Sequence, residues 1–243
     1  MSETIKADWY DLKVADRKAF IDWLHGDYLP RLQARAGIQW VGHYGMVART
    51  AIRSTDPGGP IRTHTDDPSV PKGGEYVLLT AAASPDVFFN PLTQNADSAD
   101  DRRWLAKRVE HRDAIFIVEA RVDGPEYRSV LPGTGPAPAM QLGNFITRKP
   151  EDEKELGLWY RQLRFPQISV TRGCISVRKL VSVAGWPKHG VLYDFVSMDP
   201  DEENFEKRYR QAARGEKWEG RHVLEYVIHG PGRHAGRRIW PAV

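Results

Sequence analysis

Hydrophobic residues recur at helical spacing in residues 15–28. Phe20, Trp23 and Leu24 fall on one side of a helix with a period of 3.6 residues. Pro30 follows, and because the residue before a proline avoids helical backbone angles, we expect the regular helix to stop there. This part of the chain therefore predicts one amphipathic helix that covers a buried surface.

Residues 38–46 follow the two-residue period of a strand instead. Side chains two positions apart in a strand share one face of the sheet. The alternation predicts the following faces: Ile38, Trp40 and Tyr44 on one side, and Val41 and His43 on the other.

Further segments complete an order of strand, helix, strand, strand, helix and strand. Two apolar segments rich in β-formers predict strands, and a polar, charged segment predicts a surface helix. The C-terminal half follows the same order, with Pro150 opening its first helix and residues 202–214 forming its second. The predicted elements of the N-terminal half are residues 7–13, 15–28, 38–46, 76–82, 99–111 and 114–122.

The two halves resemble each other residue by residue. Sliding the chain by 136 positions aligns residues 8–44 with residues 144–180 without a gap, and seven of the 37 positions are identical. Ordinary composition would give about two. We therefore predict two copies of one unit, residues 1–132 and 139–243, joined by a Pro/Gly-rich linker at residues 133–138.

The first copy contains an insertion that the second lacks. Residues 53–74 are rich in Pro, Gly and Asp, which is typical of a long surface loop. The repeated βαββαβ order is the ferredoxin-like unit, whose sheet has helices on one face and an apolar second face. We predict an α+β fold of two ferredoxin-like repeats whose antiparallel sheets pack face to face into an α+β barrel.

Composition narrows the class of protein. The 243-residue chain has a net charge of only +3, which does not favour nucleic-acid binding. Its single cysteine, Cys174, excludes an internal disulfide framework. No run approaches the ~18 apolar residues of a membrane span, and the N-terminus lacks an apolar signal core. We expect a cytoplasmic protein without a nucleic-acid or membrane partner.

The motif around both predicted first helices resembles the dimeric α+β barrel superfamily in its tandem-duplicated form. Relatives often end this helix with a "W…HLP…PG" pattern. The usual histidine is replaced by Tyr28 in the first copy and by Arg164 in the second. The matching positions are Trp23, Leu29, Pro30 and Gly37, and Trp159, Pro166 and Gly173.

The resemblance implies a fold more strongly than an activity. The superfamily includes quinone-forming monooxygenases without cofactors, polyketide cyclases, lactone isomerases, haem-binding enzymes, ether-degradation proteins and stress proteins, and fold does not choose among them. The chain resembles the ether-degradation, stress-responsive and polyketide-cyclase types. Because relatives often add a dimer contact, either a monomer or a homodimer is compatible with the sequence.

Two groups of residues could carry acid/base chemistry. Asp22, His25 and Tyr28 share one flank of the first helix, where the carboxylate could orient the ring. His43 and Tyr44 end the next strand, where a histidine could remove a proton from a phenol or an activated methylene. A solvated helix flank and ordinary strand packing are the alternatives. The second copy does not repeat the pair, since it has Lys179 and Leu180 there.

Two carboxylates interrupt apolar strands at matched positions. Glu119 and Glu225 must face water, pair with a cation or lie in a polar pocket. A desolvated glutamate can be a general acid or base, whereas an ion pair with a neighbouring strand is the structural alternative. We expect Trp23, Trp40, Glu225 and Arg164 to contact substrate. His64 beside two aspartates is too weak a pattern to predict a metal site.

No nucleotide-binding, nucleophile-elbow or zinc-protease motif is present. We predict an enzyme without cofactor or metal that acts by acid/base chemistry on an apolar, aromatic or polyketide-like small molecule. The reaction could be cyclisation, isomerisation, elimination or oxygenation. The predicted catalytic residues are His43, His25, Tyr28, Tyr44 and Glu119. The alternatives are a non-catalytic small-molecule-binding or stress-type protein and, third, a haem-binding protein.

Overall fold

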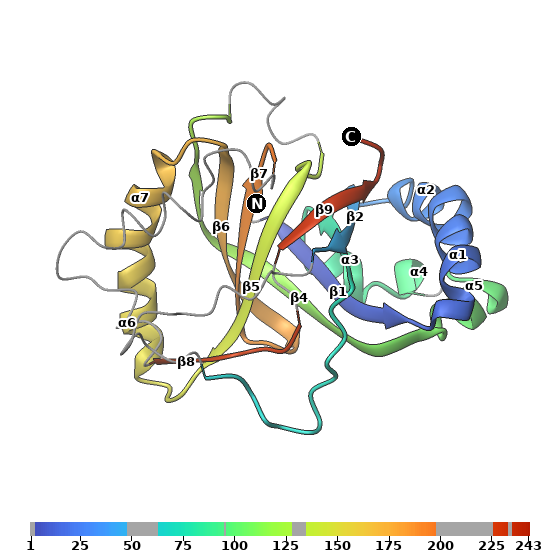
Figure 1. The fold of residues 1–243 in the computed structure, drawn as a ribbon, viewed down its shortest axis with the longest axis horizontal. Helices are drawn as coiled ribbons and strands as arrows, with labels where there is room; N and C mark the ends of the chain where they lie inside the picture. The colour runs from blue at the N-terminus through green and yellow to red at the C-terminus, as the bar shows by residue number, and fades with distance from the viewer. Residues whose placement is uncertain (1–2, 48–62, 95, 128–134, 198–225, 233–234) are drawn as a thin grey trace.

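A computed structural model shows a strand barrel between two groups of helices (Figure 1). It describes residues 3–47, 63–94, 96–127, 135–197, 226–232 and 235–243. The predicted helix at residues 202–214 and Glu225 lie outside the described residues. Within the described part of the chain, no helix is long and apolar enough to cross a membrane.

The strands form one closed antiparallel barrel rather than two separate sheets. The order β7-β6-β4-β1-β3-β2-β9-β5 is completed by pairing between β5 and β7, and the short β8 pairs with the outer end of β5. Closure leaves no open sheet edge in the ring. The strands are β1 (Thr4–Leu12), β2 (Ile38–Met46), β3 (Tyr76–Ala82), β4 (Arg108–Asp123), β5 (Ala139–Thr147), β6 (Cys174–Gly185), β7 (His189–Phe195), β8 (Val227–His229) and β9 (Ala235–Trp240).

Helices cover the outside of the barrel at its two ends (Figure 1). In each half a helix, a π-helical turn and a second helix follow one another without interruption. They are α1 (Val14–Trp23), η1 (Leu24–Tyr28) and α2 (Leu29–Gln33), then α6 (Asp152–Trp159), η2 (Tyr160–Arg164) and α7 (Phe165–Ser169). The first half also has α3 (Asp86–Phe89), α4 (Pro91–Gln94) and α5 (Ala99–Leu105).

Three apolar clusters build the core. The barrel interior is filled from both halves, with Trp9, Tyr44 and Leu180 among its members. A second cluster lies between the barrel and α1–α2, and a third lies between the barrel and α6–α7. Strands such as β3 and β7 therefore bury both of their faces, which explains why they are mainly apolar.

The helix predicted at residues 15–28 does not stop before Pro30. It passes through η1 and continues to Gln33, which corrects that expectation. The N–H of Leu29 bonds to the carbonyl of Leu24, five residues back. This wider turn lets the chain pass a proline that cannot donate a helical hydrogen bond. The same arrangement recurs at Pro166, where Phe165 bonds to Tyr160.

Two of the predicted strands have the expected bounds, whereas one predicted helix and two other strands do not. Residues 38–46 and 76–82 form strands as expected. The helix expected at residues 99–111 ends at Leu105, because the chain from Arg108 onward pairs with β1 instead. Tertiary pairing here overrides local composition. β1 and β4 are accordingly longer than predicted.

The faces of β2 also differ from the simple alternation. A β-bulge between Ile38 and Trp40 shifts the register against β3. Ile38 consequently packs with Val41 against the helices, whereas Trp40 and Tyr44 point into the barrel. One extra residue in a strand reverses the face of every side chain before it.

Candidate functional site

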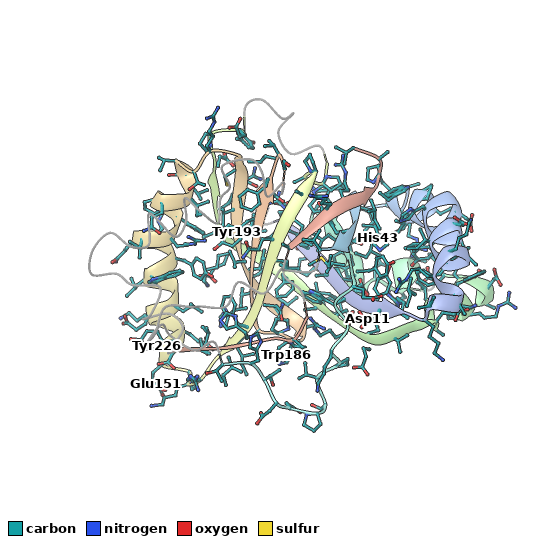
Figure 2. The ribbon with its side chains drawn as sticks, viewed as in Figure 1. Asp11, His43, Glu151, Trp186, Tyr193 and Tyr226 are labelled. Atoms are coloured by element: carbon teal, nitrogen blue, oxygen red, sulfur yellow. The ribbon has the colours of Figure 1, made fainter. Side chains whose placement is uncertain are left out.

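A chain of three hydrogen-bonded side chains runs from the first helix group into the protein. His43, on β2, is completely buried and uses both of its ring nitrogens. Its Nε2 lies 2.7 Å from the Tyr10 hydroxyl, and its Nδ1 lies 2.8 Å from Nε2 of His25. Figure 2 shows His43 between the barrel and the helices of the first half. We call Tyr10, His43 and His25 the relay.

The barrel topology brings Tyr10 and His43 together across an intervening strand. β1 and β2 do not pair with each other, because each pairs with a different edge of β3. Tyr76 of β3 lies between them, with its ring centroid 5.6 Å from that of Tyr10 and 5.4 Å from that of His43. The Tyr10 and His43 rings are nearly parallel, with an interplanar angle of 6°, whereas the His25 ring lies at 77° to that of His43.

His25 reaches the relay from η1. A π-helical turn inserts an extra residue and re-aims the side chains next to it, and such turns are frequent at functional sites. His25 is half-buried, so one edge of its ring meets solvent while Nε2 faces His43. The relay therefore links a solvent-accessible imidazole to a fully buried tyrosine.

Burial decides the protonation state of the relay. It lowers the pKa of His43 well below its usual range, and the neighbouring His25 lowers it further. Burial also lowers the pKa of His25, against the opposing charge of Asp22. The pKa of Tyr10 is raised well above its usual value by burial, although Arg108 opposes the shift. All three groups are neutral near pH 7.

Hydrogen-bond partners favour one proton arrangement in this neutral chain. Among the described residues the Tyr10 hydroxyl has no partner besides His43. The hydroxyl therefore donates its proton to Nε2 of His43 in the favoured arrangement. His43 then donates from Nδ1 to His25, and His25 carries its own proton on Nδ1. In the reverse arrangement His25 donates from Nε2 to Nδ1 of His43, and His43 donates from Nε2 to the Tyr10 oxygen. Nδ1 of His25 then presents a lone pair.

A buried carboxylate lies two residues from Tyr10 on the same face of β1. Asp8 contacts Lys6 at 3.3 Å, Arg108 at 3.2 Å and His111 at 2.9 Å. Burial alone would raise the pKa of Asp8, but Lys6, His111 and Arg108 hold it well below its usual range. Arg108 also lies 5.8 Å from the Tyr10 ring centroid. The Asp8 cluster thus places a fixed positive charge beside the inner end of the relay.

The structure separates some residues that the sequence grouped together. Asp22 pairs with Lys18 at 2.6 Å, so it does not orient His25 through a hydrogen bond. Tyr28 lies against Trp23 and donates to Asp97 at 3.4 Å; burial raises its pKa. It therefore stands near the relay without a hydrogen bond to either histidine.

The other predicted partners of His43 also point elsewhere. Tyr44 faces the barrel interior and donates to the Ala137 carbonyl at 2.9 Å, because neighbouring strand residues alternate between faces. Trp40 is likewise interior, 5.7 Å from the Arg178 guanidinium. Glu119 is paired with the buried Lys179 of β6, which is the structural alternative foreseen for it.

The remaining predicted contacts belong to different regions. Trp23 stacks on Trp104 at 5.4 Å, on the outside of the first helix group. Arg164 is buried in the second half and donates to the Tyr193 hydroxyl at 3.0 Å. His64 lies 3.2 Å from the Gly230 carbonyl, and the described residues contain no group of three or more metal-ligating side chains.

Sequence reasoning missed Tyr10, Tyr76 and the Asp8 cluster. A weak signal was present, because Asp8 and Tyr10 share one face of a strand in which polar residues alternate with apolar ones. The partner of that face could not be identified without the order of the strands. His25 and His43 were both predicted, but not that they touch.

Known structures resemble the whole barrel. No protein-family profile and no curated protein matches the chain. Solved structures do, including a putative chlorite dismutase with a TM-score of 0.56, 11% identity, and coverage of 98% of this chain and 95% of that one. A putative monooxygenase from Fusobacterium nucleatum subsp. nucleatum and an anthrone oxidase-like protein each have a TM-score of 0.53, 11% identity, and coverage of 98% and 91%.

At this identity the resemblance shows the fold alone. This likeness in fold agrees with the α+β barrel predicted from the sequence. The likeness to ether-degradation, stress-responsive or polyketide-cyclase types stays a prediction.

Proposed function

We propose that this protein is an enzyme that transfers protons to and from an apolar small molecule without a cofactor. The observation that supports the proposal is the relay, in which the half-buried His25 is hydrogen-bonded to the buried His43 and Tyr10. A neutral imidazole near its functional pH is a good general acid or base. The substrate would meet the solvent-facing edge of His25.

The relay can supply either kind of catalysis. In the favoured proton arrangement, Nδ1–H of His25 donates to a substrate oxygen and stabilises an enolate. In the reverse arrangement, Nδ1 accepts a proton from a phenol or an activated methylene. Accepting a proton leaves one positive charge on the relay, and this charge is best placed on the half-buried His25 rather than on the buried His43. His43 and Tyr10 are positioning residues, since they act through His25.

The names of two structural neighbours favour oxygenation among the possible outcomes. One is called a monooxygenase and another an anthrone oxidase-like protein. A carbanion formed by proton removal can react with O₂ directly. For anthrone the balanced reaction is anthrone plus O₂ giving anthraquinone plus water, with two hydrogens leaving the methylene carbon. Cyclisation, isomerisation and elimination need the same first proton transfer.

The test separates proton transfer from oxygenation. Anthrone is incubated with the full chain, first without oxygen in D₂O, where NMR follows methylene exchange, and then in air, where an electrode follows O₂ uptake. We expect both rates to exceed the background. His25→Gln should reduce them by about 10²-fold or more, within the usual contribution of general acid–base catalysis. His64→Gln, at an exposed histidine outside the relay, should leave them unchanged.

Two results would refute the proposal. One is exchange no faster than background for anthrone and for a panel of phenols and 1,3-diketones. The other is full activity in His25→Gln. A non-catalytic binding protein would account for the first result, provided that the same compounds bind.

His43 does not suit a role as a haem ligand. Haem iron needs a histidine ring nitrogen with a free lone pair, and His43 has both nitrogens in hydrogen bonds.

We further infer that the two halves arose by internal duplication. η1 and η2 begin 136 residues apart, and so do β2 and β6, which is the same offset that aligns the two sequences. Because the barrel closes within one chain, a monomer satisfies the apolar sheet faces, and a homodimer would be an added contact.

A further inference from the structure

The second helix–sheet interface holds buried basic groups where the first holds the relay. Lys179 of β6 stands 136 residues after His43 and is only 3% exposed. Its ammonium pairs with Glu119, whose side chain is 42% exposed. A lysine this deeply buried is rare unless an anion accompanies it.

His189 lies beside this lysine on the same outer face. β6 and β7 pair with Val181 opposite His189 and Lys179 opposite Val191, so the two basic side chains are diagonal neighbours. His189 is 3% exposed, and neither of its ring nitrogens has a hydrogen-bond partner among the described residues. A buried polar group in this state calls for a partner that the described part of the chain does not supply.

The acids that face His189 are already engaged. Glu153 of α6 lies 4.0 Å from Nε2 of His189 but pairs with Lys188, and Glu119 pairs with Lys179. Burial, together with the charges of Lys179 and Lys188, lowers the pKa of His189 to about 4, although Glu153 and Glu119 oppose the shift. His189 is therefore a buried neutral group whose two ring nitrogens have no hydrogen-bond partner among the described residues.

Flat aromatic rings form the apolar part of the same site. Phe145 of β5 stacks on His189, with ring centroids 6.0 Å apart and an interplanar angle of 21°. Phe145 also stacks on Tyr160 of η2 at 6.5 Å and 6°, and Tyr160 lies 6.0 Å from the Lys179 ammonium. Nearly parallel rings beside two basic groups favour a planar ligand with one anionic end.

We propose that this second interface binds a small aromatic carboxylate, whose anionic group is held by Lys179 and His189 and whose ring packs against Phe145 and Tyr160. Two donors within apolar walls suit a carboxylate better than a phosphate, which usually recruits an arginine cluster or a run of backbone N–H groups. The site is independent of the reaction proposed for His25 and can be tested by binding alone.

Benzoate is the probe, and ¹H NMR of the full-length protein is the measurement. The imidazole resonance of His189 is assigned by its absence in His189→Gln. We expect benzoate to bind with a Kd below about 1 mM, to shift this resonance and to raise the pKa of His189 from about 4. Calorimetry at pH 5 should therefore show proton uptake. Benzamide, which has the same ring without the charge, should bind at least tenfold more weakly.

Lys179→Met should weaken benzoate binding at least tenfold, whereas Lys154→Met, at an exposed lysine of α6, should not. Thermal unfolding checks that both variants fold. If Lys179→Met does not fold, the proposal is tested by the pKa of His189 in the unmodified protein, which should rise with benzoate and stay unchanged with benzamide. Four results would overturn the proposal. The His189 resonance could fail to shift at millimolar benzoate, benzamide could bind as tightly as benzoate, or chloride could shift the resonance as much as benzoate does. The fourth is that the protein does not bind benzoate but gives a Soret band with haemin that is lost in His189→Gln.

Discussion

Around β2, the side chains that face the helices are neutral hydrogen-bonding groups, whereas around β6 the equivalent side chains are basic. His43 is replaced by Lys179, and Tyr28 by Arg164, at positions 136 residues apart. All four are buried to a similar degree. The two helix groups have similar backbones, each with a π-helical turn followed by a proline. They nevertheless face the barrel with neutral side chains in one half and basic side chains in the other (Figure 1).

The difference shows what each interface requires. A neutral relay can be buried without an ion partner and can pass protons inward from His25. A buried lysine must be compensated, and here Glu119 reaches it from β4, across the junction between the halves. One interface is therefore complete by itself, whereas the other depends on negative charge from elsewhere.

Exchanging the two equivalent residues gives the largest expected effect. His43→Lys places an ammonium at a fully buried position next to His25 and Tyr10, and the nearby Asp8 is already paired. We expect a loss of about 3–5 kcal/mol in the free energy of unfolding, measured in urea. Lys179→His should cost clearly less, because a neutral imidazole needs no counter-charge. Equal losses would contradict the contrast between the interfaces.

The pH dependence of stability should reveal the buried His189. Its pKa is about 4 in the folded protein and 6.5 in the unfolded chain, so only the unfolded chain takes up a proton between these values. Stability should therefore fall as the pH drops from 6.5 to 4, by about 1.4 kcal/mol per pH unit and roughly 3 kcal/mol in total. In His189→Gln, urea unfolding at several pH values should show a shallower slope. An unchanged slope would mean that His189 is protonated normally.

Tyr10→Phe tests the inner end of the relay. It removes the hydroxyl and leaves Nε2 of the buried His43 without its partner, which should cost about 1–3 kcal/mol of stability. Tyr44→Phe is the matched control, because it removes a buried hydroxyl bonded to the Ala137 carbonyl inside the barrel. Both should lower the unfolding temperature, but only Tyr10→Phe should slow methylene exchange. Equal exchange rates would remove Tyr10 from the mechanism.

Asp22→Asn should have the smallest effect on stability. Its pair with Lys18 is exposed, so we expect a change within about 0.5 kcal/mol. The charge of Asp22 raises the pKa of His25, and its loss should move the acid limb of the pH–rate profile to lower pH. An unshifted limb together with a large loss of stability would show that Asp22 has a structural role instead.

The sequence alone predicted the order of helices and strands in the N-terminal half and a similar order in the C-terminal half. The 136-residue offset, the helical spacing around Trp23 and the apolar segments 38–46 and 76–82 correspond to elements of the structure. Such patterns are local, because a helix or strand must turn apolar residues to one side wherever it packs. They also identified His25 and His43 as histidines near the helix–sheet boundary.

Tertiary structure decided which residues meet. Tyr10 joins His43 because β3 lies between their strands, and no local period encodes the order of strands in a barrel. His25 turns inward because η1 widens the helix before Pro30, and Ile38 changes face because of a single bulge. The π-helical turn is local to Pro30, but the strand order and the register of the bulge depend on pairing between segments far apart in the chain, so the relay exists only once the barrel has closed.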